Sequence, residues 1–254
     1  MRCGIDLGSR SVKLVIMDDA AKELKATNIY ETAKFYRDYG QRTEKGLAVN
    51  FEALGFSEVT ALTATGYGRN TINIVGATVI PELKAHMLGV IHQTSLTDFT
   101  LLDLGGQDSK VIKVRKGRMV DFQTNDKCAA STGRYLENMA AVLDISLDEL
   151  ANYCENPVEL SATCAIFGES ELIGRIVEGY STAELAAGVN YTIYKRIKPM
   201  LSALKSDTIV FTGGVALGTA IKEFITREMG VEVIVPKYPQ LNGAIGCAVC
   251  KQSA

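Results

Sequence analysis

Two short runs of this sequence have the residue types of phosphate-binding turns. They are Asp6-Leu7-Gly8 and Asp103-Leu104-Gly105, and apolar residues that favour a strand precede each of them. Glycine permits the unusual backbone angles of a tight turn and lets a phosphate approach closely, and the N–H groups of such a turn can hold phosphate oxygens. A neighbouring carboxylate suits Mg²⁺, which keeps several of its waters. The two runs therefore indicate a site for a magnesium-bound nucleotide.

These two runs belong to a longer internal repeat. An aspartate, a glycine and a later lysine recur with the same spacing 97 residues further along the chain, which is more similarity than two unrelated hairpins require. The matched pairs are Asp6 with Asp103, Gly8 with Gly105, and Lys13 with Lys110. Each repeat predicts a strand, a tight turn and a second strand, so we expect an α/β protein with two similar lobes.

The polar residues of both turns supply groups that phosphoryl transfer needs. Hydroxyl and ammonium groups can bind or neutralise phosphate, and Gln107 with Asp108 can orient a hydrolytic water, because this chemistry depends mainly on positioning and electrostatics. We predict Asp6, Asp103 and Gln107 as catalytic residues. The predicted nucleotide-binding residues of the turns are Gly8, Ser9, Arg10, Ser11, Lys13, Gly105, Gly106, Gln107, Asp108 and Lys110.

A third glycine turn, Thr212-Gly213-Gly214-Val215, follows the apolar run 209–211 and precedes a helical pattern. Backbone N–H groups at such a position suit an adenosine or an α-phosphate, so Gly213, Gly214 and Val215 join the predicted nucleotide site. The sequence has no G-x-x-x-x-G-K-[ST] run, which excludes a P-loop NTPase, and no G-x-G-x-x-G follows the first strand, which disfavours a dinucleotide fold.

Two of the six cysteines stand at positions that favour thiolate. Cys128 and Cys164 lie among small polar residues just before strong helical patterns, and a helix N-terminus stabilises thiolate and can donate hydrogen bonds to cluster sulfides. A [4Fe–4S] cluster needs four thiolates, which a two-fold symmetric dimer would supply with two cysteines from each chain. From the residues alone, the alternative is that both are small buried apolar side chains.

The segments between the motifs predict alternating strands and helices without a flexible linker. Strands are expected at 59–64, 99–104, 119–123 and 231–235, and helices from Pro81 to about residue 93, over most of the stretch after Ala129, from about Ala216, and at 241–250. We divide the chain into an N-terminal lobe, 1–96, with the first turn, and a C-terminal lobe, 97–254, with the second turn, the cysteines and the adenosine turn.

The order of the three turns resembles that of the actin/hexokinase/heat-shock-70 superfamily. This resemblance implies a two-lobed actin-like ATPase with duplicated ribonuclease-H-like domains and with ATP or ADP in a cleft between the lobes. It also implies that Asp6 and Asp103 lie by Mg²⁺, through water, and by the γ-phosphate, with Gly213 and Gly214 under the adenosine.

Three longer blocks are similar to a narrower group. Asp103–Lys110, Asn125–Ala130 and Thr163–Ser170 resemble the activators of 2-hydroxyacyl-CoA dehydratases, of the BadF/BadG/BcrA/BcrD type, a group that includes ATPase components of benzoyl-CoA reductase and of double-cubane cluster proteins. The resemblance covers essentially the whole chain. Ser131 stands where the family's Cys-Ala-Ala-Gly-Thr-Gly block has its first glycine.

This narrower resemblance implies a specific activity. Cys128 and Cys164 of each chain would ligate one [4Fe–4S] cluster that bridges a homodimer and is reduced by ferredoxin or flavodoxin. ATP binding and hydrolysis would then drive electron transfer to a partner iron–sulfur dehydratase or reductase. The alternative readings are a sugar or acyl kinase of the same superfamily, or an ATP-dependent scaffold, and neither of these would contain iron.

The bulk composition limits the partners and the location. The chain of 254 residues has a net charge of −2 and no run rich in Lys or Arg, so we expect neither a nucleic acid nor an anionic membrane as partner. The absence of a signal peptide and of a long apolar stretch predicts a cytoplasmic protein. Cys247 and Cys250 form a C-x-x-C run, but the small residues around them predict a helix packed closely on the core.

Overall fold

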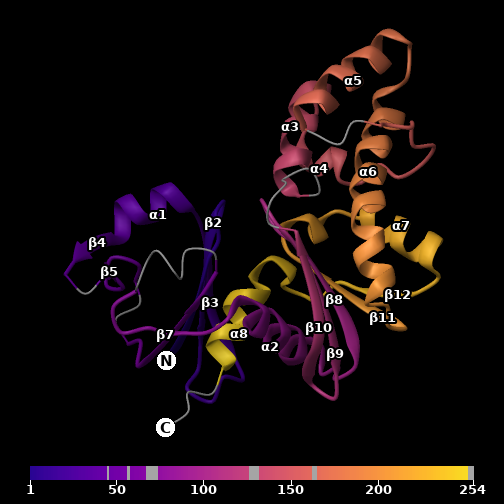
Figure 1. Ribbon diagram of the computed structural model, residues 1–254. Coiled ribbons are helices and arrows are strands. Elements are labelled where there is room, and N and C mark those ends of the chain that lie inside the picture. The colour runs from indigo at the N-terminus through magenta and orange to yellow at the C-terminus, as the bar shows by residue number, and fades with distance from the viewer. Residues whose placement is uncertain (45, 56–57, 67–73, 126–131, 162–164, 251–254) are drawn as a thin grey trace. The chain divides into compact units, whose positions relative to one another are not determined.

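The computed structural model describes residues 1–44, 46–55, 58–66, 74–125, 132–161 and 165–250. Its helices and strands, drawn in Figure 1, divide into two units. Unit 1 comprises residues 1–96 and 241–254, and unit 2 comprises residues 97–240. The sequence-based division kept 97–254 together, whereas here the segment from Leu241 lies in unit 1, because its helix packs on the first strand and on a helix of that unit.

A five-stranded sheet with the order β3-β2-β1-β6-β7 forms the centre of unit 1. β1 pairs antiparallel with β2 and parallel with β6, so the β1–β2 turn and the end of β6 lie side by side. Apolar side chains of β1, β2 and β6 are buried together with Phe35 of the helix that follows β3. The strands are β1 (Arg2–Leu7), β2 (Ser11–Met17), β3 (Leu24–Glu31), β6 (Ala61–Thr65) and β7 (Thr78–Val79). The helix α1 (Thr32–Tyr39) follows β3 and leads to the hairpin of β4 (Gly40–Thr43) and β5 (Gly46–Val49).

Glycines allow two helices to pack very closely in unit 1. These helices are α2 (Glu82–Thr94) and α8 (Asn242–Val249), and α8 also contacts β1. A Cβ placed on Gly246 would lie 1.7 Å from the Ala85 carbonyl oxygen, and one on Gly4 would lie 2.0 Å from the Ala244 carbonyl oxygen. The expectation of a small-residue helix against the core is therefore confirmed, since no larger side chain fits at these contacts.

A buried amide joins the same two helices. Asn242, the first residue of α8, is fully buried. Its Nδ2 donates a hydrogen bond to the main-chain oxygen of His86 at 2.8 Å, and its Oδ1 accepts one from Gln93 Nε2 at 3.0 Å. Because an unsatisfied buried amide is costly, these bonds fix where α8 begins.

Unit 2 repeats the sheet of unit 1. Its strand order is β10-β9-β8-β11-β12, and its first strand again pairs antiparallel with the second and parallel with the fourth. The strands are β8 (Phe99–Leu104), β9 (Ser109–Arg115), β10 (Arg118–Asn125), β11 (Thr208–Thr212) and β12 (Glu232–Ile234). The internal repeat seen in the sequence thus reflects two sheets of the same topology.

Helices cover the sheet of unit 2 and form its larger core with it. The longest, α6, begins at a capping box, in which the Ser181 side chain and Glu184 satisfy each other's backbone N–H groups. The helices are α3 (Gly133–Leu143), α4 (Leu147–Leu150), α5 (Ala165–Val177), α6 (Thr182–Ala203) and α7 (Ala220–Met229), with short 3₁₀ turns η3 (Gly214–Leu217) and η4 (Pro239–Leu241).

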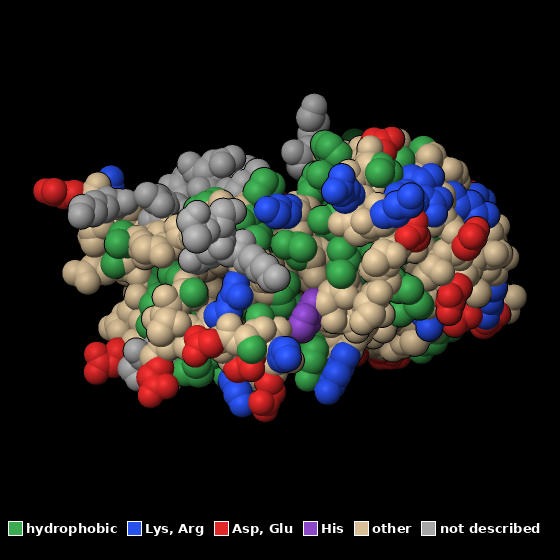
Figure 2. Space-filling view, turned by 90° about the horizontal axis from the view of Figure 1, so that it is seen from below, with side chains coloured by type: hydrophobic (Ala, Val, Ile, Leu, Met, Phe, Trp, Pro, Cys, Tyr) green, Lys and Arg blue, Asp and Glu red, His purple; other side chains and the backbone are tan. Residues whose placement is uncertain are grey.

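The predicted strands at 99–104, 119–123 and 231–235 and the helix from Pro81 agree with the structure to within a few residues. The helix expected from Ala216 begins instead as η3, and α7 follows from Ala220. No helix within the described part of the chain is both long enough and apolar enough to cross a membrane. On the face drawn in Figure 2, Lys and Arg side chains and Asp and Glu side chains are both widely distributed.

Candidate nucleotide site

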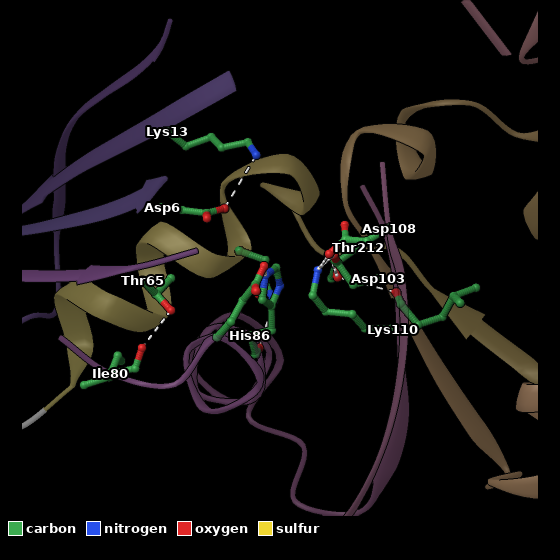
Figure 3. Close-up of polar contacts among 12 residues, drawn as sticks. Asp6, Lys13, Thr65, Ile80, His86, Asp103, Asp108, Lys110 and Thr212 are labelled. Atoms are coloured by element: carbon green, nitrogen blue, oxygen red, sulfur yellow. Dashed lines mark hydrogen bonds and ion pairs between the residues drawn. The ribbon is translucent and has the colours of Figure 1, made fainter. Parts of the chain in front are cut away.

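The carboxylate of Asp6 lies near the end of β1, directly opposite Lys13 of β2. Lys13 Nζ is 3.5 Å from Asp6 Oδ2, and the two side chains are 17% and 6% exposed. Because solvent screening falls with burial, this attraction is stronger than that of a surface pair. The close-up in Figure 3 shows the two side chains directed toward each other.

The turn between β1 and β2 is narrow and is anchored to α1. A Cβ on Gly8 would lie 2.7 Å from the Ser11 carbonyl oxygen and 3.0 Å from Lys13 Nζ, so glycine is required there. The Gly8 carbonyl accepts a hydrogen bond from Thr32 Oγ1 at 2.8 Å, and the Arg10 carbonyl accepts one from the Thr32 N–H at 3.3 Å. Since Thr32 is the first residue of α1, the start of this helix holds the first turn in place.

The second turn, between β8 and β9, has the same strand register as the first turn and makes more polar contacts. Asp103 of β8 lies opposite Lys110 of β9, with Lys110 Nζ 3.8 Å from Asp103 Oδ2. The same ammonium group donates a hydrogen bond to the Asp108 carboxylate. The Gly105 N–H donates to the Asp108 main-chain oxygen at 3.0 Å, which closes the turn. A Cβ on Gly105 would lie 2.6 Å from Asp108 Oδ1, so a larger residue there would displace the Asp108 carboxylate.

The adenosine turn begins at the end of β11, beside the second turn. Thr212 lies next to Asp103 in the parallel β11–β8 register and is fully buried. Its hydroxyl donates a hydrogen bond of 2.7 Å to Asp103 Oδ1. Gly213 has φ +91°, and a Cβ there would lie 2.1 Å from the Leu104 carbonyl oxygen. The strand ending and the turn are thus pressed directly against the end of β8.

Gly214 and Val215 differ in what they expose. Gly214 is exposed, and a Cβ built on it would lie 3.6 Å from the Gln240 side-chain nitrogen. The Val215 side chain is buried in the core of unit 2, so only its backbone is available to a ligand. Of the remaining predicted residues, Ser9, Arg10 and Gln107 are exposed at the tips of their turns, as a role in binding or in orienting water requires.

The second turn is bonded to the helix that follows the β8–β10 meander. The Gly133 N–H donates a hydrogen bond to the Gly105 carbonyl at 2.9 Å, and the Arg134 N–H donates one to the Gly106 carbonyl at 3.0 Å. These N–H groups belong to the first turn of α3, which has no intrahelical acceptors for them. A displacement of the second turn therefore acts directly on the start of α3.

These observations fit a nucleotide with Mg²⁺. In each unit, a tight glycine turn lies beside a nearly buried carboxylate and a lysine, which are groups that suit phosphate and a hydrated Mg²⁺. In unit 1 these residues are Asp6 and Lys13 beside the first turn. In unit 2 they are Asp103 and Lys110 beside the second turn and the adenosine turn.

The predicted cluster ligands Cys128 and Cys164 lie outside the described residues. Within the described ranges, no group of three or more His, Cys, Asp or Glu side chains is arranged to hold a metal ion. Cys3 and Cys247 are buried in unit 1, where burial raises the pKa of the Cys3 thiol to about 12 and, together with the charge of Asp6, raises that of the Cys247 thiol. Burial therefore disfavours the reactive thiolate of both residues, and Cys247 packs within the small-residue helix α8.

Thr212 and Thr32 contact the predicted turns but were not predicted as functional residues. A signal for Thr212 was present in the sequence, since Thr65-Gly66 at the end of β6 matches Thr212-Gly213 at the end of β11. Both glycines have positive φ, and a Cβ on either would strike the preceding parallel strand. The internal repeat therefore extends beyond the two hairpins to the strand that follows each of them in the sheet.

Comparison with known proteins supports this assignment. The family model described as "BadF/BadG/BcrA/BcrD ATPase family" matches residues 3–250. The chain is 33% identical over 251 residues to the 2-hydroxyisocaproyl-CoA dehydratase activator of Clostridioides difficile, covering 97% of this chain and 92% of that protein. It is also 33% identical over 260 residues to the (R)-2-hydroxyglutaryl-CoA dehydratase activating ATPase of Acidaminococcus fermentans, covering 97% and 95% of the two chains.

A solved structure is similar over the same length. It is that of the activator of the 2-hydroxyisocaproyl-CoA dehydratase from Clostridium difficile with bound ADPNP, with a TM-score of 0.83, 30% identity and coverage of 100% of this chain and 99% of that one. The fold predicted from the order of the turns, an α/β actin-like ATPase with a duplicated domain, is therefore confirmed.

Proposed function

Because the chain belongs to the BadF/BadG/BcrA/BcrD ATPase family, we propose that it is an activator which couples ATP hydrolysis to electron transfer into a partner iron–sulfur enzyme. The observation that carries the proposal is the pair of hydrogen bonds between the second phosphate turn and the first turn of α3. These bonds give the nucleotide a direct mechanical connection to the helix that follows Cys128.

The proposed ATPase site uses both units. Asp6 and Asp103 hold the Mg²⁺ ion through water, and the two glycine turns bind the phosphates. Lys13 and Lys110 neutralise the charge that develops on the transferred phosphoryl group, while Gln107 orients the attacking water. Gly213, Gly214 and the backbone of Val215 bind the adenosine.

The proposed electron carrier is a [4Fe–4S] cluster shared by two copies of the chain. Cys128 and Cys164 of each copy would hold it, because a cluster needs four thiolates and one chain offers two just before helical sequence patterns. When bound, the cluster supplies one-electron redox chemistry. Ferredoxin or flavodoxin is the proposed donor, and the proposed acceptor is a dehydratase or a reductase that contains iron and sulfur, in the cytoplasm.

Contacts between α3 and α5 support a route from ATP to the two helices that follow Cys128 and Cys164 in the sequence. Glu171 of α5 accepts hydrogen bonds from the Ser161 N–H at 2.8 Å and from the Ser161 hydroxyl at 2.9 Å. A Cβ on Gly168 of α5 would lie 3.5 Å from the Tyr135 ring of α3. Since α3 and α5 are in contact, a movement of α3 by the second turn is passed to α5 as well.

The test is anoxic purification followed by iron and sulfide analysis and an ATPase assay. The proposal expects about four irons per dimer and ATP hydrolysis without an added phosphoryl acceptor. Cys128→Ser or Cys164→Ser should remove iron and abolish ATP-dependent reduction of the partner while ATP binding is retained. A matched control is Cys154→Ser, which removes a partly exposed free thiol in unit 2 and should leave the iron content unchanged.

The alternatives give different results. A sugar or acyl kinase would transfer phosphate to a small molecule and contain no iron, and a scaffold would assemble without iron. A colourless, metal-free protein isolated without oxygen, with Cys128 and Cys164 dispensable, would therefore remove the electron-transfer proposal and leave only the ATPase.

A further inference from the structure

The repeated sheets place the same three residue types side by side in each unit. In unit 1, Lys13, Asp6 and Thr65 are neighbours across β2, β1 and β6. In unit 2, Lys110, Asp103 and Thr212 are neighbours across β9, β8 and β11. Directly opposite residues project to the same face of a sheet, so each threonine is placed to reach its aspartate.

Only one of the two threonines contacts its aspartate. Thr212 Oγ1 donates to Asp103 Oδ1 at 2.7 Å, whereas Thr65 Oγ1 donates to the Ile80 carbonyl oxygen at 2.9 Å. Both bonds are drawn in Figure 3. Both threonines are fully buried, so their environments differ in hydrogen bonding and not in exposure to water.

The neighbouring strand explains the difference. β7 pairs with β6 up to Ala64, and the Ile80 N–H continues the pairing by donating to the Ala64 carbonyl at 3.0 Å. This added pairing brings the Ile80 carbonyl oxygen within hydrogen-bond distance of the Thr65 hydroxyl. In unit 2, the pairing of β12 with β11 ends at Val210, two residues before Thr212, so the hydroxyl of Thr212 is directed to the carboxylate.

We infer that Thr212 is a positioning residue for ATP hydrolysis, whose hydroxyl holds the Asp103 carboxylate in the orientation that the magnesium site needs. The inference rests on the proposed ATPase function. With Oδ1 bonded to Thr212 and Oδ2 facing Lys110, both carboxylate oxygens have a fixed direction. Thr212 is also continuous with Gly213, so the same residue links the adenosine turn to the carboxylate.

The test compares matched variants of the two threonines. Thr212→Val removes the hydroxyl and keeps the shape, and Thr212→Ser keeps the hydroxyl. Thr65→Val is the control, because it removes an equally buried hydroxyl that bonds to a main-chain oxygen and not to a carboxylate. The assays are ATP hydrolysis as a function of ATP and of Mg²⁺, affinity for ADP without Mg²⁺, and the midpoint of thermal unfolding.

Thr212→Val should lower kcat by about ten-fold to a hundred-fold, the range expected for the loss of one hydrogen bond to a charged group. The Mg²⁺ concentration for half-maximal rate should rise, while KM for ATP and the affinity for ADP stay within about two-fold. Thr212→Ser should recover most of the rate. Thr65→Val should lower the unfolding midpoint but leave kcat within about two-fold.

A purely structural role for Thr212 predicts a lower unfolding midpoint with an unchanged kcat, and a role in adenosine binding predicts a raised KM. Either result overturns the inference, as does a serine variant no better than valine. If the valine variant does not fold, Thr212→Ala replaces it with the same expectations. A wild-type protein without ATPase activity would refute the proposed function, whereas an active wild type with an equally active Thr212→Val refutes only the role of Thr212.

Discussion

The two phosphate turns have the same backbone register but hold their aspartates differently. Asp6 has the Lys13 ammonium group at 3.5 Å, and the equivalent threonine bonds elsewhere. Asp103 receives a hydrogen bond from Thr212 and faces Lys110, which is itself bonded to Asp108. Duplication therefore preserved the strands and the turn, while the side-chain contacts diverged.

The anchoring of the turns to the helices that follow them diverged in the same way. A side-chain hydroxyl and the N–H of Thr32 hold the first turn, whereas two successive backbone N–H groups, of Gly133 and Arg134, hold the second. Backbone bonds on consecutive residues restrain a turn more rigidly than a side chain with a rotatable χ1. The second turn is therefore held by two backbone hydrogen bonds, and the first turn by one backbone and one side-chain hydrogen bond.

Replacing each aspartate by asparagine should give the largest effects. Asp103→Asn and Asp6→Asn should each lower kcat by about 10² to 10³, as expected when a preorganised electrostatic group is removed from a phosphoryl-transfer site. The two variants should differ in stability. Asp103→Asn should lower the free energy of unfolding by about 3 kcal/mol, because it breaks a buried charge pair and a charge-assisted hydrogen bond.

Asp6→Asn should lower the free energy of unfolding by only about 1 kcal/mol, because its ion pair with Lys13 is more exposed and its carboxylate accepts no hydrogen bond from Thr65. Urea unfolding of both variants measures the difference, and equal losses would contradict the distinction between an aspartate that is bonded to a threonine and one that is not. The fall in kcat should be similar in the two variants, since both residues are proposed to serve the same Mg²⁺ ion. It therefore provides a reference for the difference in stability.

Alanine variants of Gly66 and Gly213, the equivalent glycines after β6 and β11, test whether the backbone is equally strained at these two places. Gly66→Ala and Gly213→Ala each place a side chain at positive φ, +106° and +91°, and 2.6 Å and 2.1 Å from a main-chain oxygen of the adjacent strand. Each should lower the free energy of unfolding by at least about 2 kcal/mol, with the larger loss for Gly213→Ala.

Only Gly213→Ala should weaken nucleotide binding, which a titration with a fluorescent ADP analogue measures. The control is Gly174→Ala, because a Cβ on this residue of α5 meets no atom within 4 Å. That variant should be about 0.5 to 1 kcal/mol more stable than the wild type, since alanine favours a helix interior. A stable, nucleotide-binding Gly213→Ala protein would show that the close contact with β8 is not needed.

Breaking the connection between the second turn and α3 should largely preserve ATP hydrolysis but weaken its coupling to electron transfer. Proline at position 133 removes the N–H that bonds to Gly105, and its ring would collide with the Gly105 carbonyl, so the second turn must move away from the start of α3. Gly133→Pro should keep ATP hydrolysis within about ten-fold but reduce the amount of partner reduced per ATP. An unchanged ratio would mean that these hydrogen bonds do not transmit the nucleotide state.

The sequence predicted the features that depend on local pattern. The Asp-Leu-Gly turns, the strand-glycine-glycine turn and the small-residue helix all follow from residue types within about ten positions of one another, and the repeat of Asp and Lys correctly indicated equivalent hairpins. The predicted ligands Cys128 and Cys164 and their cluster remain predictions, because these residues lie outside the described part of the chain.

Contacts between distant segments could not be predicted in this way. The hydrogen bond of Thr212 to Asp103 depends on where β12 stops pairing with β11, and no single-residue pattern encodes that point. The assignment of α8 to unit 1 likewise depends on Gly89, Gly246 and Gly4, which lie far apart in the sequence and meet only in the folded protein.

The smallest predicted effect tests the side-chain hydrogen bond that holds the first turn. Thr32→Val removes the hydrogen bond to the Gly8 carbonyl but keeps the N–H that bonds to Arg10, and it should lower the free energy of unfolding by about 1 kcal/mol. Because Asp6 keeps its contact with Lys13, kcat should fall by no more than about three-fold, and Thr32→Ser should behave like the wild type. A fall in kcat for Thr32→Val as large as the fall in partner reduced per ATP for Gly133→Pro would contradict this expectation. The side-chain bond would then hold the first turn as firmly as backbone bonds hold the second, and the two turns would differ only in how their aspartates are bonded.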